Sequence, residues 1–428
     1  MTENQRAEAR PLMTPNYIAK IEGHGEIQLD IEKNTARLVI HEGERLFEGM
    51  IVQKRHDETY WITPRICGVC PIAHNLACLA AVENAFGVKL SPSSAALRRI
   101  LLAAQNIQSH VLHLYFLSLP EYLGVDSGVE ISKTHPVHFK AAVALRAFSD
   151  MVAETIGGRA VHPITPTTGG FHKYPSQDVL KMIKKETAKV KKLGEHTYNL
   201  AAGITYPDLR RGTEYFTTVG DDENYPMTNT NRVISTKGLS QSIQEYNSLI
   251  KERVKDYSTA KFSEHNGRGF MVGSLARFKN AHDRLLGPAR EMYDKNKELF
   301  SHHNSFLNNL AQAIELNHFI AEIDKQLDFL LKEGVDEKIA DFQPKESRAV
   351  GAAEVPRGTL YYELAFDNDG RVTYANIITP TAQNLTNIEE DANEILKTIG
   401  KDKSPEEKND LIEKLIRAYD PCLSCSVH

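Results

Sequence analysis

The sequence lacks several features that would place it in a specialised class. Its 428 residues include five cysteines, too few for the disulfide framework of a secreted scaffold. No apolar run approaches the roughly 18 residues that a membrane-spanning helix needs, and the polar start has no apolar core of a signal peptide. We therefore expect a cytoplasmic protein without a transmembrane segment.

The charge balance also excludes one class of partner. The chain has 51 Lys and Arg against 56 Asp and Glu, a net charge of -5, so no overall positive charge favours nucleic acid or anionic lipid. Apolar residues make up 41% and charged residues 25%, an ordinary globular composition. We expect a packed fold and no nucleic-acid partner.

Periodicity predicts both helices and strands. Apolar and polar residues alternate over 17–41 and again over 359–379, which predicts two β-hairpins. Apolar residues recur at helical spacing over 97–111 and 306–330, and almost everything between the hairpins has a helical pattern. The predicted fold class is mainly α (α+β), a bundle of long helices with small β-hairpins at its periphery.

Near the C-terminus, a capping pattern predicts the start of a helix. Ser404, Pro405 and Glu407 form a capping box with proline at the first helical position, and Pro421 must end that helix. The second cysteine pair therefore follows a helix end.

The domain organisation is predicted to be simple. We expect residues 1–16 to form a flexible N-terminal tail and residues 17–428 to form a single domain. The stretch 205–232 lacks periodicity and is rich in Pro, Gly, Asp, Asn and Thr, which is typical of a surface excursion or a boundary.

The cysteines are grouped in an unusual way. Four of the five form two CxxC pairs near opposite ends of the chain, Cys67 with Cys70 and Cys422 with Cys425, and only Cys78 lies between them. Two such pairs supply four soft ligands for zinc, nickel or an iron–sulfur cluster, and spacing alone does not choose among these. A structural zinc site and a thioredoxin-type redox pair are the alternative interpretations.

The residues around the two pairs narrow the choice. The sequences RICGVCPIAH over 65–74 and DPCLSCSVH over 420–428 match RxCGxCxxxH and DPCxxC at every fixed position. The chain thus resembles the large, metal-bearing subunit of nickel–iron hydrogenases, and most closely the cytoplasmic group that is coupled to NAD(P) or a deazaflavin. Further similar stretches are Lys20–His24, Glu48, His110 with His113, Gly157–Pro163, Val272–Arg277 and Glu354–Gly358.

The resemblance implies two metal sites. All four cysteines bind nickel, and Cys70 and Cys425 also bridge to an iron that carries carbon monoxide and cyanide. Three further groups hold magnesium or a similar hard ion: Glu48, the main-chain carbonyl of Ile377, and His428. Family members are typically cut just after a histidine in DPCxxCxxH, so a chain ending at His428 is expected to be the mature, metal-loaded form.

The resemblance also implies that residues 17–428 form a single catalytic domain whose two ends meet at the metal site. It further implies a catalytic role for several residues of that domain. Dihydrogen is a very weak acid, so splitting it needs an electrophile and a base. We expect Cys422 to be the first proton acceptor and Glu22 to relay the proton outward. Arg357 is expected to act by charge and position, because a guanidinium is a poor general base.

Other residues are expected to line or support the site. Pro356, Thr381 and Asp420 resemble residues that line it or hydrogen-bond the cyanides, and His74 resembles a donor to a cysteine sulfur. The remaining histidines of the similar stretches, His110 among them, are interpreted as packing residues.

The electrons taken from H2 need a partner subunit to accept them. The sequence has no P-loop, no GxGxxG after a strand and no spare cysteine cluster, so this chain cannot pass electrons to a nucleotide. The resemblance implies an iron–sulfur small subunit that holds all iron–sulfur clusters, and diaphorase subunits that reduce a soluble acceptor, preferably NAD(P). Alternatives are a hydrogen-sensing subunit with the same site, a quinone-coupling relative, and a zinc-stabilised four-cysteine interaction protein.

Overall fold

The computed structural model describes residues 16–427. The predicted N-terminal tail, apart from Asn16, and His428 lie outside the described residues. No helix in the described part of the chain is long and apolar enough to cross a membrane.

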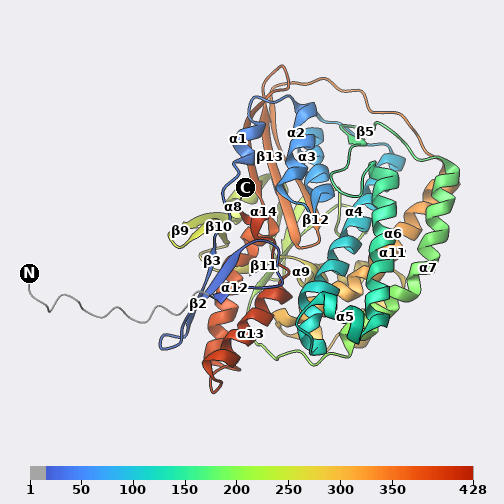
Figure 1. The fold of residues 1–428 in the computed structure, drawn as a ribbon. Helices are drawn as coiled ribbons and strands as arrows, with labels where there is room; N and C mark the ends of the chain where they lie inside the picture. Colours follow the sequence, from blue (N-terminus) through green and yellow to red (C-terminus); the bar gives the residue numbers. More distant parts are fainter. Residues whose placement is uncertain (1–15, 428) are drawn as a thin grey trace, which may run out of the picture.

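Four long helices form one side of the molecule (Figure 1). They are α4 (Pro92–Leu112), α6 (Pro136–Gly157), α7 (Gln177–Ala202) and α11 (Asn308–Glu333). Helix α11 packs against α4 and α7, and α6 packs against the same two helices. The apolar stripes of α4 and α11 lie in the core, so the two predicted helices and the mainly helical fold class are confirmed.

A buried three-stranded antiparallel sheet stands beside this bundle. Its strands run in the order β12 (Ser347–Val355), β13 (Gly358–Phe366) and β14 (Val372–Ile378). Helix α3 (Pro71–Phe86) lies directly on β12, and a Cβ at Gly351 would come within 2.2 Å of the Ala81 nitrogen. The predicted second hairpin is confirmed as β13–β14. Its strand β13 is buried between β12 and β14, whereas β14 is the edge strand and is exposed at Thr373 and Tyr374.

The expectation of helix between the hairpins fails over 233–271, and the non-periodic stretch 205–232 contains a strand. Residues 214–271 contain a four-stranded sheet and a separate hairpin. The sheet has the order β11 (Phe270–Met271), β6 (Glu214–Val219), β7 (Arg232–Ser235) and β8 (Ser240–Ser242), and the hairpin joins β9 (Lys251–Lys255) to β10 (Ser258–Glu264). Strand β6 (Glu214–Val219) is buried along its whole length, so it shows no alternation of apolar and polar residues. Tyr225 and Met227 also reach the core. Residues 205–232 are therefore more than a surface excursion.

The N-terminal and C-terminal segments lie side by side: Glu22 forms a β-bridge with Cys422, and Figure 1 draws α14 (Leu423–Ser426) near the N-terminal strands. The predicted first hairpin is β2 (Gly25–Asp30) with β3 (Thr35–Ile40). Helix α12 (Pro380–Lys397) packs on β3. The predicted capping box opens α13 (Pro405–Ala418), which ends before Pro421.

The remaining elements are shorter. They are β1 (Asn16–Tyr17), α1 (Phe47–Ile51), α2 (His56–Ile62), α5 (Gly128–Thr134), β4 (Pro166–Thr167), β5 (Gly170–Phe171), β7 (Arg232–Ser235), β8 (Ser240–Ser242), α8 (Tyr246–Leu249), β9 (Lys251–Lys255), β10 (Ser258–Glu264), β11 (Phe270–Met271), α9 (Ser274–Ala281) and α10 (Gly287–Asn296).

Candidate metal centre

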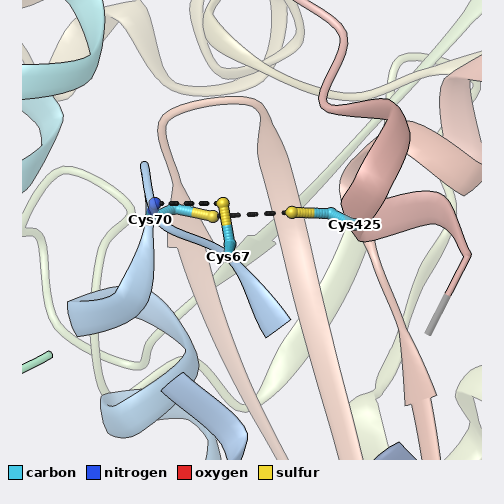
Figure 2. Close-up of side chains that lie close together, drawn as sticks. All are labelled: Cys67, Cys70 and Cys425. Atoms are coloured by element: carbon cyan, nitrogen blue, oxygen red, sulfur yellow. Dashed lines mark hydrogen bonds between the residues drawn. The ribbon is translucent and has the colours of Figure 1, made fainter. Parts of the chain in front are cut away.

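The four paired cysteines come together in the core. Cys67 and Cys70 precede α3, which begins at Pro71, while Cys422 and Cys425 flank the start of α14. The sulfur of Cys67 lies 3.6 Å from that of Cys422, and the sulfur of Cys70 lies 4.0 Å from that of Cys425. Figure 2 shows the side chains of Cys67 and Cys70 pointing toward Cys425, which comes from the C-terminal end of the chain.

The geometry suits one shared metal centre. The sulfurs of Cys67, Cys70 and Cys425 all lie within 4.8 Å of one another, and all four cysteines are buried. Hydrogen bonds from Cys422 and Cys425 lower the pKa of Cys67 well below its usual range, while burial raises the pKa of Cys422 and Cys425 well above it. Four thiolates therefore need a cation to coexist here.

Backbone amides support the first cysteine pair. The N–H of Val69 donates to the Cys67 sulfur over 3.3 Å, and the N–H of Cys70 donates to it over 3.2 Å. Such donors stabilise a thiolate at the point where the chain turns into α3.

A small cavity borders the sulfurs of Cys70, Cys422 and Cys425. Four of the other predicted site residues also line it: His74, Pro356, Arg357 and Thr381.

Arg357 places a buried positive charge at this cavity. Its Nε donates to the main-chain carbonyl of Asp420 over 2.6 Å, and its Nη2 donates to the Asp420 carboxylate over 2.9 Å. Burial by itself lowers the pKa of Arg357, but Asp420 and the cysteine charges together raise it well above its usual range. The guanidinium is therefore a fixed cation.

Polar contacts hold the segment that carries the second cysteine pair. The N–H of Cys422 donates to the Thr381 hydroxyl over 2.9 Å. Asp420 takes a left-handed backbone conformation with φ 54°, and its carboxylate accepts a hydrogen bond of 3.1 Å from the Gln312 amide. Gln312 thus holds the Asp420 carboxylate, which in turn binds the Arg357 guanidinium.

Glu22 lies against the same segment. Glu22 forms a parallel β-bridge with Cys422, and its main-chain carbonyl accepts a hydrogen bond of 2.9 Å from the N–H of Leu423. Its carboxylate accepts the N–H of Ser424 over 3.2 Å and also the Ser424 hydroxyl. That hydroxyl lies 4.0 Å from the Cys422 sulfur.

His74 has a polar contact that the sequence did not suggest. Its Nδ1 lies 2.7 Å from the hydroxyl of Tyr362 on β13. The expected contact with a cysteine sulfur stays a prediction.

The predicted hard-ion site is partly assembled. A carboxylate oxygen of Glu48 lies 2.8 Å from the main-chain nitrogen of Ile377, which donates to it, and the second oxygen lies 3.8 Å from the Lys261 ammonium. The structure therefore brings Glu48 beside Ile377, while His428 lies outside the described residues.

Sequence reasoning missed several supporting residues. Arg277 is buried and donates to the carbonyl of Val355 over 2.8 Å, which fixes the turn before Arg357; its stretch was noted as similar, but no role was assigned. Arg45 donates to the carbonyls of Ile66 and Ser424 and so joins the two cysteine segments. No signal in the sequence pointed to Arg45 or to Gln312.

Comparison with known proteins decides the family. A family model described as nickel-dependent hydrogenase matches residues 45–144 and 235–428. The chain belongs to the nickel-dependent hydrogenase family. This hydrogenase is 36% identical over 420 residues to sulfhydrogenase 1 subunit alpha of Pyrococcus furiosus, with 97% of each chain covered.

Two further comparisons concern NAD-linked enzymes. The hydrogenase is 26% identical to the NAD-reducing hydrogenase HoxS subunit beta of Cupriavidus necator, over 96% of this chain and 93% of the other. The structure of an NAD⁺-reducing [NiFe]-hydrogenase in its H2-reduced state matches with a TM-score of 0.85 and 26% identity, covering 96% of this chain and 98% of that one. This chain is a hydrogenase large subunit, an oxidoreductase that activates H2 at a nickel centre.

Proposed function

We propose that the four cysteines hold a nickel–iron centre and that each predicted site residue keeps its role there. The observation that carries this proposal is the meeting of four buried sulfurs, from both ends of the chain, around a cavity that Arg357 lines. Four thiolates are the soft donor set that nickel and iron accept.

The surroundings fit a centre whose iron carries carbon monoxide and two cyanides. Among the described residues, Arg357 Nη1 has no hydrogen-bond partner although it is buried, so a donor is available for a small anionic ligand. Pro356 and Thr381 line the same cavity and leave room for no more than small groups.

The protein's own residues complete the reaction. When bound, the metal pair supplies the electrophile that polarises H2. Cys422 takes the proton on its sulfur, because that sulfur lies 4.0 Å from the Ser424 hydroxyl, which donates to the Glu22 carboxylate. We infer that the Ser424 hydroxyl, between the Cys422 sulfur and the Glu22 carboxylate, passes this proton to Glu22.

Arg357 contributes by charge and position. Held twice by Asp420, its guanidinium cannot turn away from the cavity, and its charge offsets part of the charge of the thiolates. His74 supports the cysteines from the first turn of α3.

A second site for magnesium or a similar hard ion is proposed at Glu48, the carbonyl of Ile377 and His428. Its support is the contact of 2.8 Å that already joins Glu48 to Ile377. Carboxylate and carbonyl oxygens are the ligands that magnesium prefers.

The electrons are proposed to pass to an iron–sulfur small subunit and, through diaphorase subunits, to NAD(P). The chain has no cysteine for a cluster beyond the four at the cavity and the buried Cys78. A relative and a solved structure, both named as NAD-reducing, support this acceptor. The cytoplasmic location stays a prediction.

Infrared absorption of the purified protein tests the centre directly, since no side chain absorbs where metal-bound carbon monoxide and cyanide stretch. We expect bands from one carbonyl and two cyanides, together with one nickel per chain by elemental analysis. A spectrum without these bands from protein that is fully loaded with zinc would refute the nickel–iron assignment.

A further inference from the structure

Asp420 belongs to a buried chain of hydrogen bonds. The donor and acceptor atoms of this chain determine which of them carry protons. The Asp420 carboxylate accepts from Arg357 Nη2 on one oxygen and from the Gln312 Nε2 amide on the other. Gln312 therefore presents its NH2 group to Asp420, and its carbonyl oxygen, Oε1, faces the opposite way.

That carbonyl oxygen meets His113. The Nδ1 of His113 lies 2.5 Å from Gln312 Oε1, and its Nε2 lies 2.6 Å from the main-chain oxygen of Arg417. Both partners are carbonyl oxygens, which only accept hydrogen bonds, so both ring nitrogens must carry a proton. An imidazole with two N–H groups is an imidazolium.

The opposite orientation of Gln312 is disfavoured by charge. Turning the amide round would give His113 Nδ1 a donor, but it would replace the N–H that Asp420 accepts with a carbonyl oxygen, against a carboxylate already paired with Arg357. Turning the imidazole ring would place carbon atoms at both carbonyl oxygens and lose two hydrogen bonds in the core, where His113 is 1% exposed.

The charged groups nearby have their own partners. On α11, Glu315 is bound by Arg277 and lies 3.0 Å from His110 Nε2. On α13, the guanidinium of Arg417 is bound by Glu121 and Glu413. Among the described residues, Asp420, one amide away, is therefore the negative group joined to His113.

His113 also reaches Asp420 along the backbone. The Arg417 carbonyl that accepts from His113 accepts the N–H of Asp420 as well, over 2.9 Å. His113 thus holds the left-handed turn at Asp420 through the main chain and, through Gln312, through the side chain.

We propose that His113 is a fixed imidazolium that, with Gln312, positions Asp420 and through it the Arg357 guanidinium. His113 and Gln312 are positioning residues, since neither lines the cavity. The sequence-based interpretation of His113 as a packing histidine is thereby extended. The charge assignment rests on hydrogen bonds alone, whereas its effect on the metals rests on the proposed function.

The charge can be read by nitrogen-15 NMR of histidine-labelled, metal-loaded protein. We expect both ring nitrogens of His113 to show the shifts of protonated nitrogens, because both face carbonyl oxygens. His318 is the internal control, because its Nδ1 accepts the N–H of Leu286 over 3.1 Å and must be bare. The variants H113Q and H318Q assign the two sets of signals, and a bare nitrogen at His113 would overturn the proposal.

Should H113Q fail to fold, the same signals can be assigned in Q312M, which keeps the histidine but removes its side-chain acceptor. The positioning role is read from the infrared bands of metal-bound carbon monoxide and cyanide. We expect Q312M to shift these bands and to lower H2/D⁺ exchange at least tenfold. The matched control Q326M, on the same helix and bonded to Glu322, should do neither.

Unchanged bands and exchange in Q312M would refute the positioning role. Absence of the bands in unmutated protein that is fully loaded with zinc would instead refute the nickel–iron assignment, and the NMR result for His113 would stand apart from it. The two proposals therefore fail in different measurements.

Discussion

Arg357 is bound twice by one residue, Asp420, through both the main-chain carbonyl and the carboxylate. The two hydrogen bonds fix the plane of the guanidinium, so its third nitrogen, Nη1, is held without a partner among the residues described. A donor that is fixed before the substrate arrives costs no reorganisation during the reaction. This relationship makes Arg357 the residue whose replacement is most informative.

We expect Arg357→Lys to lower the rate of H2 oxidation by roughly 10²-fold or more while nickel content stays unchanged. A lysine keeps the charge, but its single nitrogen cannot bond both Asp420 oxygens and still face the cavity. Dye-linked H2 uptake and elemental analysis measure the two quantities. Arg348→Lys, on the neighbouring strand β12 and largely exposed, is the control. Full activity in Arg357→Lys would contradict the claim that Arg357 acts through its fixed position.

Glu22→Gln should abolish proton exchange and leave the metals in place. Glutamine has nearly the same shape and can still accept from Ser424, but it cannot take up and release a proton. Isotope exchange between D2 and water measures the effect, with the infrared bands as the check on the metals. Glu32→Gln, in the turn of the β2–β3 hairpin and exposed, should behave as the unmutated protein. Exchange at the original rate in Glu22→Gln would show that another group carries the proton.

Replacing cysteines one at a time separates ligands from core residues. We expect Cys70→Ser to lose bound nickel and H2 cleavage, because a bridging thiolate is removed. Cys78→Ser should keep both. Burial raises the pKa of Cys78 to about 11, and its sulfur lies 3.5 Å from the Thr59 hydroxyl, so it is a thiol bonded within the core. Nickel and activity at normal levels in Cys70→Ser would contradict the bridging assignment.

The sequence predicted the parts of the site that lie within short motifs. Both CxxC pairs could be found because their neighbours match fixed patterns, and helix α11 because its apolar residues recur at helical spacing. Arg45 could not be found, since it bonds Ser424 across 379 positions and nothing local marks it.

The same limit explains why the strands between 214 and 271 were not predicted. Strand β6 is buried on both faces and reads EYFTTV, without the alternation that identifies a half-exposed strand. The role of Gln312 likewise depends on which residues face it from the π-helical turn after α4 (His113–Ser118) and from the turn after α13. Contacts of this kind are set by packing between distant elements, and periodicity does not report them.

His318 is expected to make stability depend on pH between about 4 and 6.5. Burial lowers its pKa to about 4, so the folded protein keeps this imidazole neutral while the unfolded chain takes up a proton below about 6.5. Stability from this group is therefore complete above pH 6.5 and falls by about 1.4 kcal/mol per unit as the pH drops toward 4.

His318→Asn should remove this dependence, because asparagine can still accept the N–H of Leu286 but does not titrate. Between pH 6.5 and 5 the unmutated protein should lose about 2 kcal/mol more of its free energy of unfolding than the variant does. Urea unfolding at the two pH values measures the difference. His172→Asn, at an exposed histidine, should leave the dependence as it is. Equal losses in the unmutated protein and His318→Asn would mean that the folded state protonates His318 as readily as the unfolded chain does.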